Sequence, residues 1–360
     1  MKRIAKKIRI ICISLFLILL LALGVFTIVL KVKNNRFIGQ SDKQFVNYLN
    51  QNKIVLNQKT YESGQTLFDD ETYKSNVILL GESHGAANVQ SIDKEIFLHL
   101  NKKLGVRYYL AEMDSIRANR LNNFLCGLEK DTVLLKKIVI DIRQRIPQQS
   151  SVELYEKWSD IYDYNTTLPD TLKLSVIGVD TDFDSDSPIS RDSAMIQNFK
   201  CIVKKKKIET EQFYGLFGLF HVLQNGVNSD NFQPFGARLK TNGFKTTSIA
   251  CLYIDSKIYL PKNNQIPTPP SEQIGFLNMD GPLVLVKGIN DLKKTSNKNE
   301  ATLFNLKAVK SPYFKSKKLI TMKTNFFNQV ITPFNEQLST TDFVQYAIII
   351  RNSKALTPIK

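Results

Sequence analysis

The residues of this sequence that are best suited to chemistry are two histidines and three carboxylates, each at or just after the end of a short apolar run. They are Glu82, His84, Glu112, Asp180 and His221. A neutral imidazole, whose ordinary pKa is about 6.5, can accept a proton from water near neutral pH. A carboxylate beside the ring can hold it in one tautomer. These residue types therefore indicate a candidate acid–base site.

The first two residues stand in Gly81-Glu82-Ser83-His84-Gly85, after four consecutive apolar residues and before an apolar spacing typical of a helix. This order predicts a buried strand, a loop and a helix. Ligands of open α/β sheets bind beyond the carboxyl ends of the strands, and the flanking glycines allow the backbone to approach a ligand closely. The alternative is that Glu82 caps the helix and His84 is an ordinary loop residue.

Further strand-like runs alternate with helical patterns along the chain. The strands are expected at residues 105–114, 172–180, 213–221 and 245–254, and the helices at 116–128, 133–142 and 152–164. This alternation predicts an α/β fold with a mixed, largely parallel sheet and helices on both faces. The strands that end at Leu80, Ala111, Val179 and Phe220 should lie side by side with their carboxyl ends at one edge. His84 and His221 should then lie within the roughly 15 Å that one small-ligand pocket spans.

Two features that lie close in sequence to these candidate residues are expected to have no chemical role. The third histidine, His99, follows the first motif and is interpreted as a surface residue of the helix there. Asp182, Asp184 and Asp186 alternate in the manner of a calcium loop, but the glycine and the closing glutamate of an EF-hand are absent. We interpret these three carboxylates as a solvated acidic turn.

Composition limits the possible classes of protein. The chain has 360 residues, of which 43% are hydrophobic and 23% charged, enough for one large or two ordinary globular domains. Its formal charge of +16 comes from lysines spread along the chain without a nucleic-acid-binding motif, so no nucleic-acid partner is expected. The densest run, residues 204–207, is interpreted as a solvated helix end. The spacing of the four cysteines indicates neither a disulfide framework nor a zinc site.

The N-terminus predicts a membrane anchor. Residues 10–30 contain no charge and match the ~20 residues that cross a bilayer as a helix. No small-residue cleavage site follows, so the segment is expected to be retained in the lipid bilayer as a single-pass anchor. Five positive charges precede it and three follow, which by the positive-inside rule places the N-terminus in the cytoplasm and the main domain outside.

The sequence therefore divides into four expected parts. Residues 1–9 form a basic cytoplasmic N-terminus, 10–30 the anchor, 31–70 a connecting segment with a helix near 41–52, and 71–360 one α/β domain. Residues 260–360 are expected to complete the sheet and its lid. Within them, four prolines between 261 and 270 indicate a linker or a long active-site loop.

Several short motifs, in order from about residue 77 to residue 358, carry a resemblance to a known family. They include Gly81-Glu-Ser-His-Gly85, Ala111-Glu112, Trp158 with Tyr164-Asn165, Ile177-Gly-Val-Asp180, Arg191-Asp192 with Met195, and Gly236-Ala-Arg-Leu239. On these residues the chain resembles the erythromycin esterase-like family, within a broader group that includes haem-uptake and Tiki-type proteins. The resemblance implies an α/β fold and a polar site at the strand ends.

The chain departs from the family pattern at three positions. One residue separates Glu82 from His84, where the esterase motif usually has two. Gly218 stands where the family usually carries another histidine, and Lys94 is the cation near the place of an arginine in the esterase branch. By the same resemblance, Arg191 and Lys94 are candidate substrate-binding residues.

The resemblance implies hydrolysis of an ester or similar bond in a small-molecule or envelope-derived substrate, without a cofactor. His84 is the expected base, Glu112 or Glu82 would orient it, and His221 would donate to the developing oxyanion. Since no Gly-x-Ser-x-Gly motif occurs, water is expected to attack directly. Two alternatives to this expectation remain. In the first, the site is a divalent-metal centre of the Tiki type; in the second, it is a non-catalytic cleft that binds an envelope glycan, lipid or haem. In the metal alternative, the ligands are Glu82, His84, Glu112 and His221.

Overall fold

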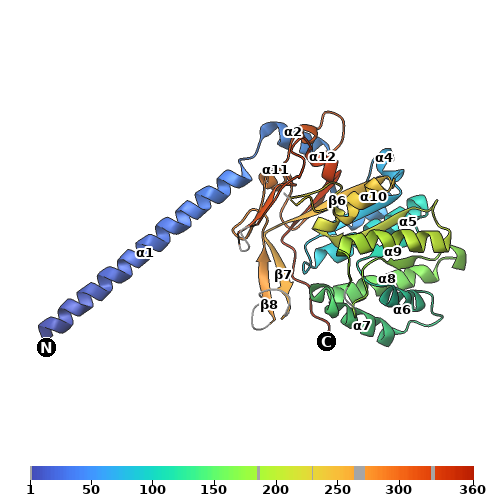
Figure 1. Cartoon of the computed structure of the whole chain (residues 1–360), viewed down its shortest axis with the longest axis horizontal. Helices are drawn as coiled ribbons and strands as arrows, with labels where there is room; N and C mark the ends of the chain where they lie inside the picture. The colour runs from blue at the N-terminus through green and yellow to red at the C-terminus, as the bar shows by residue number, and fades with distance from the viewer. Residues whose placement is uncertain (1, 185–186, 229, 263–271, 326–328) are drawn as a thin grey trace.

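A long N-terminal helix projects from an α/β body in the computed structural model (Figure 1), which describes all residues except 1, 185–186, 229, 263–271 and 326–328. Within the described ranges, the main sheet has eight strands. In spatial order they are β1 (Lys53–Leu56), β10 (Ala301–Asn305), β13 (Tyr346–Arg351), β6 (Thr246–Ile254), β2 (Val77–Glu82), β5 (Phe213–Gly218), β3 (Tyr108–Ala111) and β4 (Ser175–Gly178). From β13 to β4 all neighbours are parallel, whereas β1 and β10 are antiparallel. The mixed, largely parallel α/β sheet is thus confirmed.

Helices cover both faces of this sheet, as predicted. The aromatic side chains of two successive residues in β5 show it, because neighbours in a strand point to opposite faces. The ring of Tyr214 stacks on Phe97 at 5.8 Å, while that of Phe213 meets Phe199 at 5.1 Å. Phe97 belongs to one helical layer and Phe199 to the other. The layers are α5 (Asn88–Leu104), α6 (Ser115–Leu125), α7 (Thr132–Asp141) and α8 (Val152–Thr166) on one face, and α9 (Arg191–Lys206) and α10 (Phe235–Thr241) on the other.

The four strands expected to carry the site residues are adjacent, in the order β2-β5-β3-β4, with parallel registers. Their carboxyl ends therefore lie along one edge of the sheet. Every residue of β2 is buried, consistent with its continuous apolar run. The prediction was wrong in one detail, because β5 ends at Gly218. His221 belongs to the following 3₁₀ helix, η4 (Leu219–Val222), which redirects the chain along the sheet edge.

The last hundred residues contribute to the main sheet and also build smaller structures beside it. Strands β10 and β13 join the main sheet, and β9 (Val284–Val286), β11 (Met322–Thr324) and β12 (Gln329–Ile331) form a separate antiparallel sheet. Strands β7 (Ser256–Leu260) and β8 (Gln273–Leu277) form a hairpin. Most of the proline-rich segment expected at 261–270 lies outside the described residues.

The N-terminal helix α1 (Lys2–Ile38) is longer than the expected anchor. Its stretch Arg9–Ile38 contains an 18-residue window with a mean hydropathy of 3.0 and no buried residue, so the helix is long and apolar enough to cross a membrane. The next helix, α2 (Lys43–Gln51), is capped by the side chain of Asp42. Strand β1, which lies in the segment 31–70 taken as a connection, is an edge strand of the main sheet.

The prediction for His99 was wrong. Its side chain is buried, and Nε2 lies 2.9 Å from the hydroxyl of Tyr73. Burial, with smaller contributions from Lys103 and Lys102, lowers the pKa of His99 to about 4, so the ring is neutral at physiological pH. It packs in the body, away from the strand-end residues.

The remaining short elements connect these parts. They are α3 (Gln58–Glu62), α4 (Asp70–Tyr73), α11 (Ile289–Thr295), α12 (Thr340–Phe343), η1 (Ile142–Gln144), η2 (Pro147–Gln149), η3 (Asp170–Leu172) and η5 (Pro312–Lys315). Residues 204–207 are exposed at the end of α9, as expected. All four cysteines are free in the described structure.

Candidate active site

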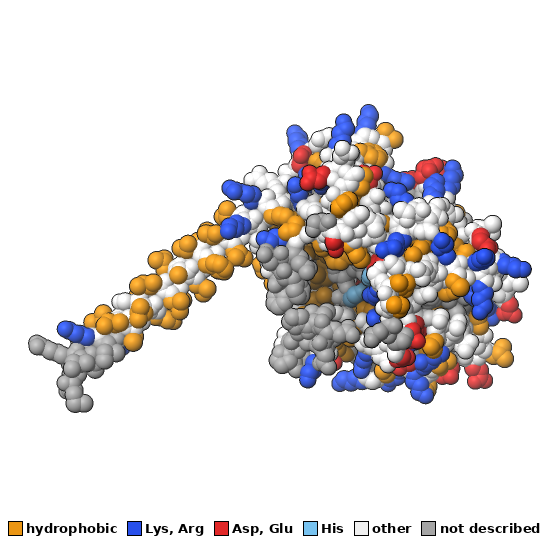
Figure 2. Space-filling view, viewed as in Figure 1, with side chains coloured by type: hydrophobic (Ala, Val, Ile, Leu, Met, Phe, Trp, Pro, Cys, Tyr) orange, Lys and Arg blue, Asp and Glu red, His pale blue; other side chains and the backbone are white. Residues whose placement is uncertain are grey.

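A cavity of about 320 Å³ opens at the carboxyl edge of β2, β5 and β3. Its floor carries ionisable side chains and its opposite wall is apolar. The lining residues are Glu82, Ser83, His84, Glu112, Arg191, Gly218, Leu219, Phe220, His221, Met279, Val284, Met322, Thr324 and Ile331. Figure 2 shows a hollow on this face in which pale-blue histidine atoms lie beside orange hydrophobic ones. The volume suits a small ligand. A larger cavity of about 500 Å³, beside β1 and α5, contains none of the candidate residues.

His84 is oriented by Glu82, the last residue of β2. The ring atom Nδ1 lies 3.0 Å from Glu82 Oε1, which also accepts a hydrogen bond of 2.6 Å from the amide of Gln149. Because a carboxylate only accepts hydrogen bonds, it favours the tautomer with a proton on Nδ1. The other nitrogen, Nε2, is then free to accept a proton, and it lies 3.9 Å from Glu112 Oε2.

The loop that carries His84 is fixed from two sides at Gly85. Its φ is +104°, and a Cβ there would lie 2.5 Å from Ile258 Cγ1 and 2.7 Å from the carbonyl oxygen of Tyr259. Only glycine fits this backbone conformation beneath β7. The Gly85 carbonyl accepts hydrogen bonds from the backbone amides of Tyr259 and Leu356, each at 2.9 Å.

The segment around Leu356 also holds the turn that delivers Gln149. Residues 355–359 pair with the chain at Ala86 and at Ser151, and the Val152 amide donates to the Thr357 carbonyl at 2.8 Å. One extended segment therefore ties the His84 loop to the chain that follows Gln149.

The carboxylate of Glu112 lies at the centre of the site. It follows β3, and its side chain is only 2% exposed. The Gly218 amide donates to Oε2 at 2.7 Å, and Arg191 Nη2 and His221 Nε2 lie 2.8 Å and 3.6 Å from Oε1. Burial alone would raise the pKa of Glu112, but the charges of His221, Arg191 and His84 hold it below its ordinary value. Glu112 is therefore ionised and faces both histidines.

Arg191 joins Glu112 to Asp180. The guanidinium Nε lies 2.9 Å and 3.0 Å from the two oxygens of Asp180, and Nη2 contacts both carboxylates. Nη1 is 3.4 Å from His221 Nε2. Arg191 is the first residue of α9, which begins after the capping residue Ser190, so the start of this helix positions the guanidinium at the sheet edge.

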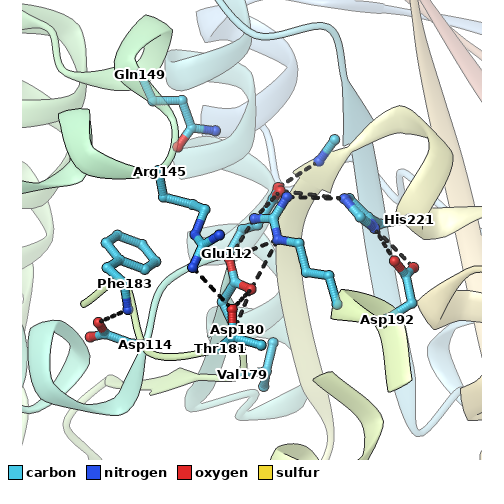
Figure 3. Close-up of polar contacts among 12 residues, drawn as sticks. Glu112, Asp114, Arg145, Gln149, Val179, Asp180, Thr181, Phe183, Asp192 and His221 are labelled. Carbon is cyan, nitrogen blue, oxygen red and sulfur yellow. Dashed lines mark hydrogen bonds and ion pairs between the residues drawn. The ribbon is translucent and has the colours of Figure 1, made fainter. Parts of the chain in front are cut away.

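His221 has its own orienting carboxylate. Its Nδ1 lies 3.0 Å and 2.9 Å from the oxygens of Asp192, which is fixed in turn by the Phe235 amide at 2.7 Å. Burial alone would lower the pKa of His221, but the hydrogen bond with Asp192 and the charges of Glu112 and Asp192 raise it overall. Figure 3 shows His221 between Glu112 and Asp192.

Gly218 lets the two rings share one carboxylate. A Cβ at this position would lie 3.2 Å from His84 Nε2 and 3.4 Å from His221 Cδ2, closer than side-chain atoms usually pack. The ring of His84 therefore occupies space that a side chain at position 218 would need.

The structure brings together most of the residues expected from the sequence. Glu82, His84, Glu112, Asp180, Arg191 and His221 form one connected group. Lys94 is not part of it, because its ammonium lies 2.6 Å from Asp160 on α8 and borders another cavity. Asp182 and Asp184 are exposed, as expected, and Asp186 lies outside the described residues.

Two site residues were missed by sequence reasoning. Asp192 had a detectable signal, because it adjoins Arg191 in one of the motifs that carry the family resemblance. Gln149 had none, since it ends the three-residue 3₁₀ helix η2 between α7 and α8, and a lone glutamine carries no recognisable pattern.

One feature of the donor set opposes a divalent cation. Nδ1 of each histidine faces a carboxylate, Glu82 or Asp192, as in many metal-binding histidines, but the Arg191 guanidinium lies against Glu112, the carboxylate that a cation would need. A fixed positive charge in this position opposes a second one. Among the described residues, no group of three or more histidine, cysteine, aspartate or glutamate side chains has the geometry of a metal site.

The pKa of His84 yields a testable pH dependence. Burial alone would lower it, but the hydrogen bond and charge of Glu82, together with the charge of Glu112, raise it above the ordinary histidine value.

Glu82→Gln keeps the shape of the side chain and removes its charge, so the pKa of His84 should fall. A base acts when deprotonated, so the acidic limb of kcat/KM should move to lower pH. NMR titration of the ring measures the shift, with His221 as the internal control. An unchanged His84 titration would contradict this account.

Comparison with known proteins shows the fold. No protein-family model and no curated protein matches the sequence. Among solved structures, a succinoglycan biosynthesis protein matches with a TM-score of 0.60 and 12% identity, over 88% of this chain and 98% of that one. A Bacillus cereus protein matches with 0.61 and 11%, over 88% and 98%. A mutant of the erythromycin esterase EreC in its open conformation matches with 0.50 and 10%, over 89% and 99%. The chain thus has the fold that its resemblance to the erythromycin esterase-like family implied.

Proposed function

We propose that the protein is a membrane-anchored hydrolase that cleaves an ester or similar bond by direct attack of water. The observation that carries this proposal is the paired arrangement of the histidines. Each imidazole is held at Nδ1 by its own carboxylate, and the two Nε2 atoms face the same carboxylate, Glu112, at 3.9 Å and 3.6 Å. Such a pair can hold one acid and one base across a bound carbonyl.

The two histidines have different surroundings and are suited to different roles. His84 Nε2 takes a proton from water as the water oxygen attacks the carbonyl carbon. In its imidazolium form, with Nδ1 on Asp192, His221 donates a hydrogen bond from Nε2 to the oxyanion, and the neighbouring Arg191 guanidinium adds a fixed positive charge. Collapse of the tetrahedral intermediate breaks the bond to the leaving oxygen, which receives the proton from His84. Glu112 holds the rings and the arginine in place.

Attack by water fits the contacts better than a covalent intermediate does. A serine, threonine or cysteine nucleophile needs a base within hydrogen-bond reach. In the part of the chain that the structure describes, the polar partners of His84 are Glu82, Gln149 and Glu112, and neither ring of the site pairs with a hydroxyl or thiol. Ser83 and Thr324 line the cavity without such a contact.

The anchor supports an extracytoplasmic location for this site. Helix α1 is apolar over a length that spans a bilayer, and the larger number of positive charges precedes the apolar run. The N-terminus is then cytoplasmic and the α/β body lies outside. A reporter enzyme fused after Lys360 should be active only outside the cytoplasm, and cytoplasmic activity would reverse the assignment.

The proposed function is tested with the purified full-length chain in detergent on a panel of ester substrates, before and after exhaustive chelation. We expect cleavage of at least one ester and no loss of rate on chelation. Loss with recovery on adding back a divalent ion would favour the metal-dependent alternative. Tight ligand binding without cleavage of any ester would favour a non-catalytic envelope protein.

A further inference from the structure

The apolar wall of the cavity is one face of the small sheet β9-β11-β12. In its antiparallel register, Met322 pairs with Ile331 and with Val286, and Thr324 pairs with Val284. Directly paired residues, and residues two apart in a strand, point to the same face. The four sheet residues that line the cavity therefore share one face, and three of them are apolar.

The cavity is divided in polarity. The ionisable groups come from the carboxyl edge of the main sheet and from α9, whereas the small sheet, Met279 and Phe220 supply apolar surface opposite them. A ligand that satisfies both sides has a polar, carbonyl-bearing end at the histidines and an apolar part against the small sheet. Such a ligand is an amphiphile.

The same small sheet is attached to the end of the N-terminal helix. The side-chain amide of Asn325, just after β11, donates a hydrogen bond of 3.2 Å to the side-chain oxygen of Asn34. The backbone amide of Gly288, just after β9, donates one of 2.8 Å to the carbonyl of Ile38. Figure 1 shows α1 leaving the body beside these strands. The apolar wall is therefore built on the segment that connects the body to the membrane-spanning helix.

We infer that the substrate is a single-chain acyl ester drawn from the membrane surface, with its acyl chain against the face formed by Val284, Met322 and Ile331 and its ester carbonyl between His84 and His221. This inference rests on the proposed hydrolase function. Hydrolysis adds the water oxygen to the acyl carbon, releases a free fatty acid and returns a proton to the alcohol. Each methylene buried against the wall contributes about 0.8 kcal/mol, or roughly fourfold in kcat/KM.

Chain length provides the first test. The full-length protein in detergent is assayed on p-nitrophenyl acetate, butyrate, hexanoate and octanoate. We expect kcat/KM to rise by up to about fourfold per methylene until the cavity is filled. Ile331→Gln should lower the ratio of octanoate ester to acetate ester cleavage at least tenfold. Val330→Gln is the matched control, because its side chain lies on the other face of β12, and it should leave the ratio unchanged.

A binding measurement separates this inference from the proposed function. Calorimetric titration with octanoate and with acetate should show at least tenfold tighter binding of octanoate, and Ile331→Gln should abolish the difference. Ester cleavage without chain-length dependence would overturn the inference and leave the hydrolase intact. Preference for octanoate without cleavage of any ester would overturn the hydrolase and leave an acyl-binding cavity. Equal binding of both acids would overturn the acyl-chain assignment even if the variant failed to fold.

The membrane source is tested with protein reconstituted into phosphatidylcholine vesicles that contain monooctanoylglycerol. We expect release of octanoate, which decreases in Ile331→Gln and persists in Val330→Gln. Cleavage of soluble p-nitrophenyl octanoate without cleavage of the vesicle-borne ester would overturn the membrane source.

Discussion

His84→Ala is expected to lower kcat by roughly 10²–10⁴-fold, the usual contribution of a positioned acid–base group, without unfolding the protein. The side chain is 22% exposed at the cavity floor and contributes little packing to the core. Glu82 keeps the hydrogen bond from Gln149 when the ring is removed, so its buried carboxylate retains a partner. Steady-state kinetics on a cleaved ester measures the loss, and thermal unfolding checks the fold.

The matched control is Lys94→Ala, which also removes a polar side chain near the carboxyl edge of β2. Lys94 pairs with Asp160 on the surface of α8, so turnover should remain within about twofold of the parent. His99→Ala is unsuitable as a control, because that ring is buried against Tyr73 and its loss would destabilise the body. Full activity in His84→Ala would show that another group is the base.

Arg191→Gln is expected to have the second large effect, on both stability and turnover. The Glu112 and Asp180 side chains are 2% and 0% exposed, and the guanidinium lies between them. Removing one partner of a fully buried ion pair lowers the free energy of unfolding by ~3–5 kcal/mol. Because the arginine is 29% exposed, its loss should lower it by somewhat less, roughly 2–4 kcal/mol. Turnover should fall roughly 10²–10³-fold, as when an oxyanion donor is removed.

The pH dependence of this destabilisation has a defined sign. The pKa of Glu112 is held below its ordinary value by His221, Arg191 and His84. The stabilisation is therefore complete above the ordinary pKa of glutamate and is lost as pH falls through the lowered value. Denaturant unfolding at several pH values should show the largest difference between parent and variant near neutral pH. A difference that grew in acid would contradict the assignment.

A surface pair provides the reference for this experiment. Arg120 contacts Asp141, with side chains 34% and 36% exposed. Arg120→Gln should cost at most about 1 kcal/mol, because solvent screens an exposed pair. Equal effects of the two substitutions would mean that Arg191 does not offset buried charge.

The parallel part of the fold was predictable because its signals are local. Each of the site strands is a short apolar run, and the rule that ligands bind at the carboxyl ends of parallel strands places the following polar residue. Glu82, Glu112 and Asp180 could be assigned to one edge for this reason. The position of Arg191 came from the family resemblance rather than from periodicity.

The parts that were not predictable depend on contacts between distant segments. Strands β9, β11 and β12 have three residues each, too short for a period-two pattern, and they are specified by pairing with one another. The burial of His99 depends on Tyr73, and the role of Gln149 depends on a turn with no repeating pattern. Sequence patterns identified the chemistry of the floor, whereas the apolar wall needed the three-dimensional structure.

The segment 355–359, which ties the His84 loop to the chain after Gln149, has a consequence for the order of assembly. It is synthesised long after both partners, and the nearby contact between Asn88 and Ser353 spans 265 residues. Such contacts form late because a long loop must close first. The parallel strands can therefore pair before Gln149 and His84 are fixed relative to each other. In a growing chain, the arrangement of the candidate site around Glu82 and His84 is completed only once residues 355–359 have been made and have paired.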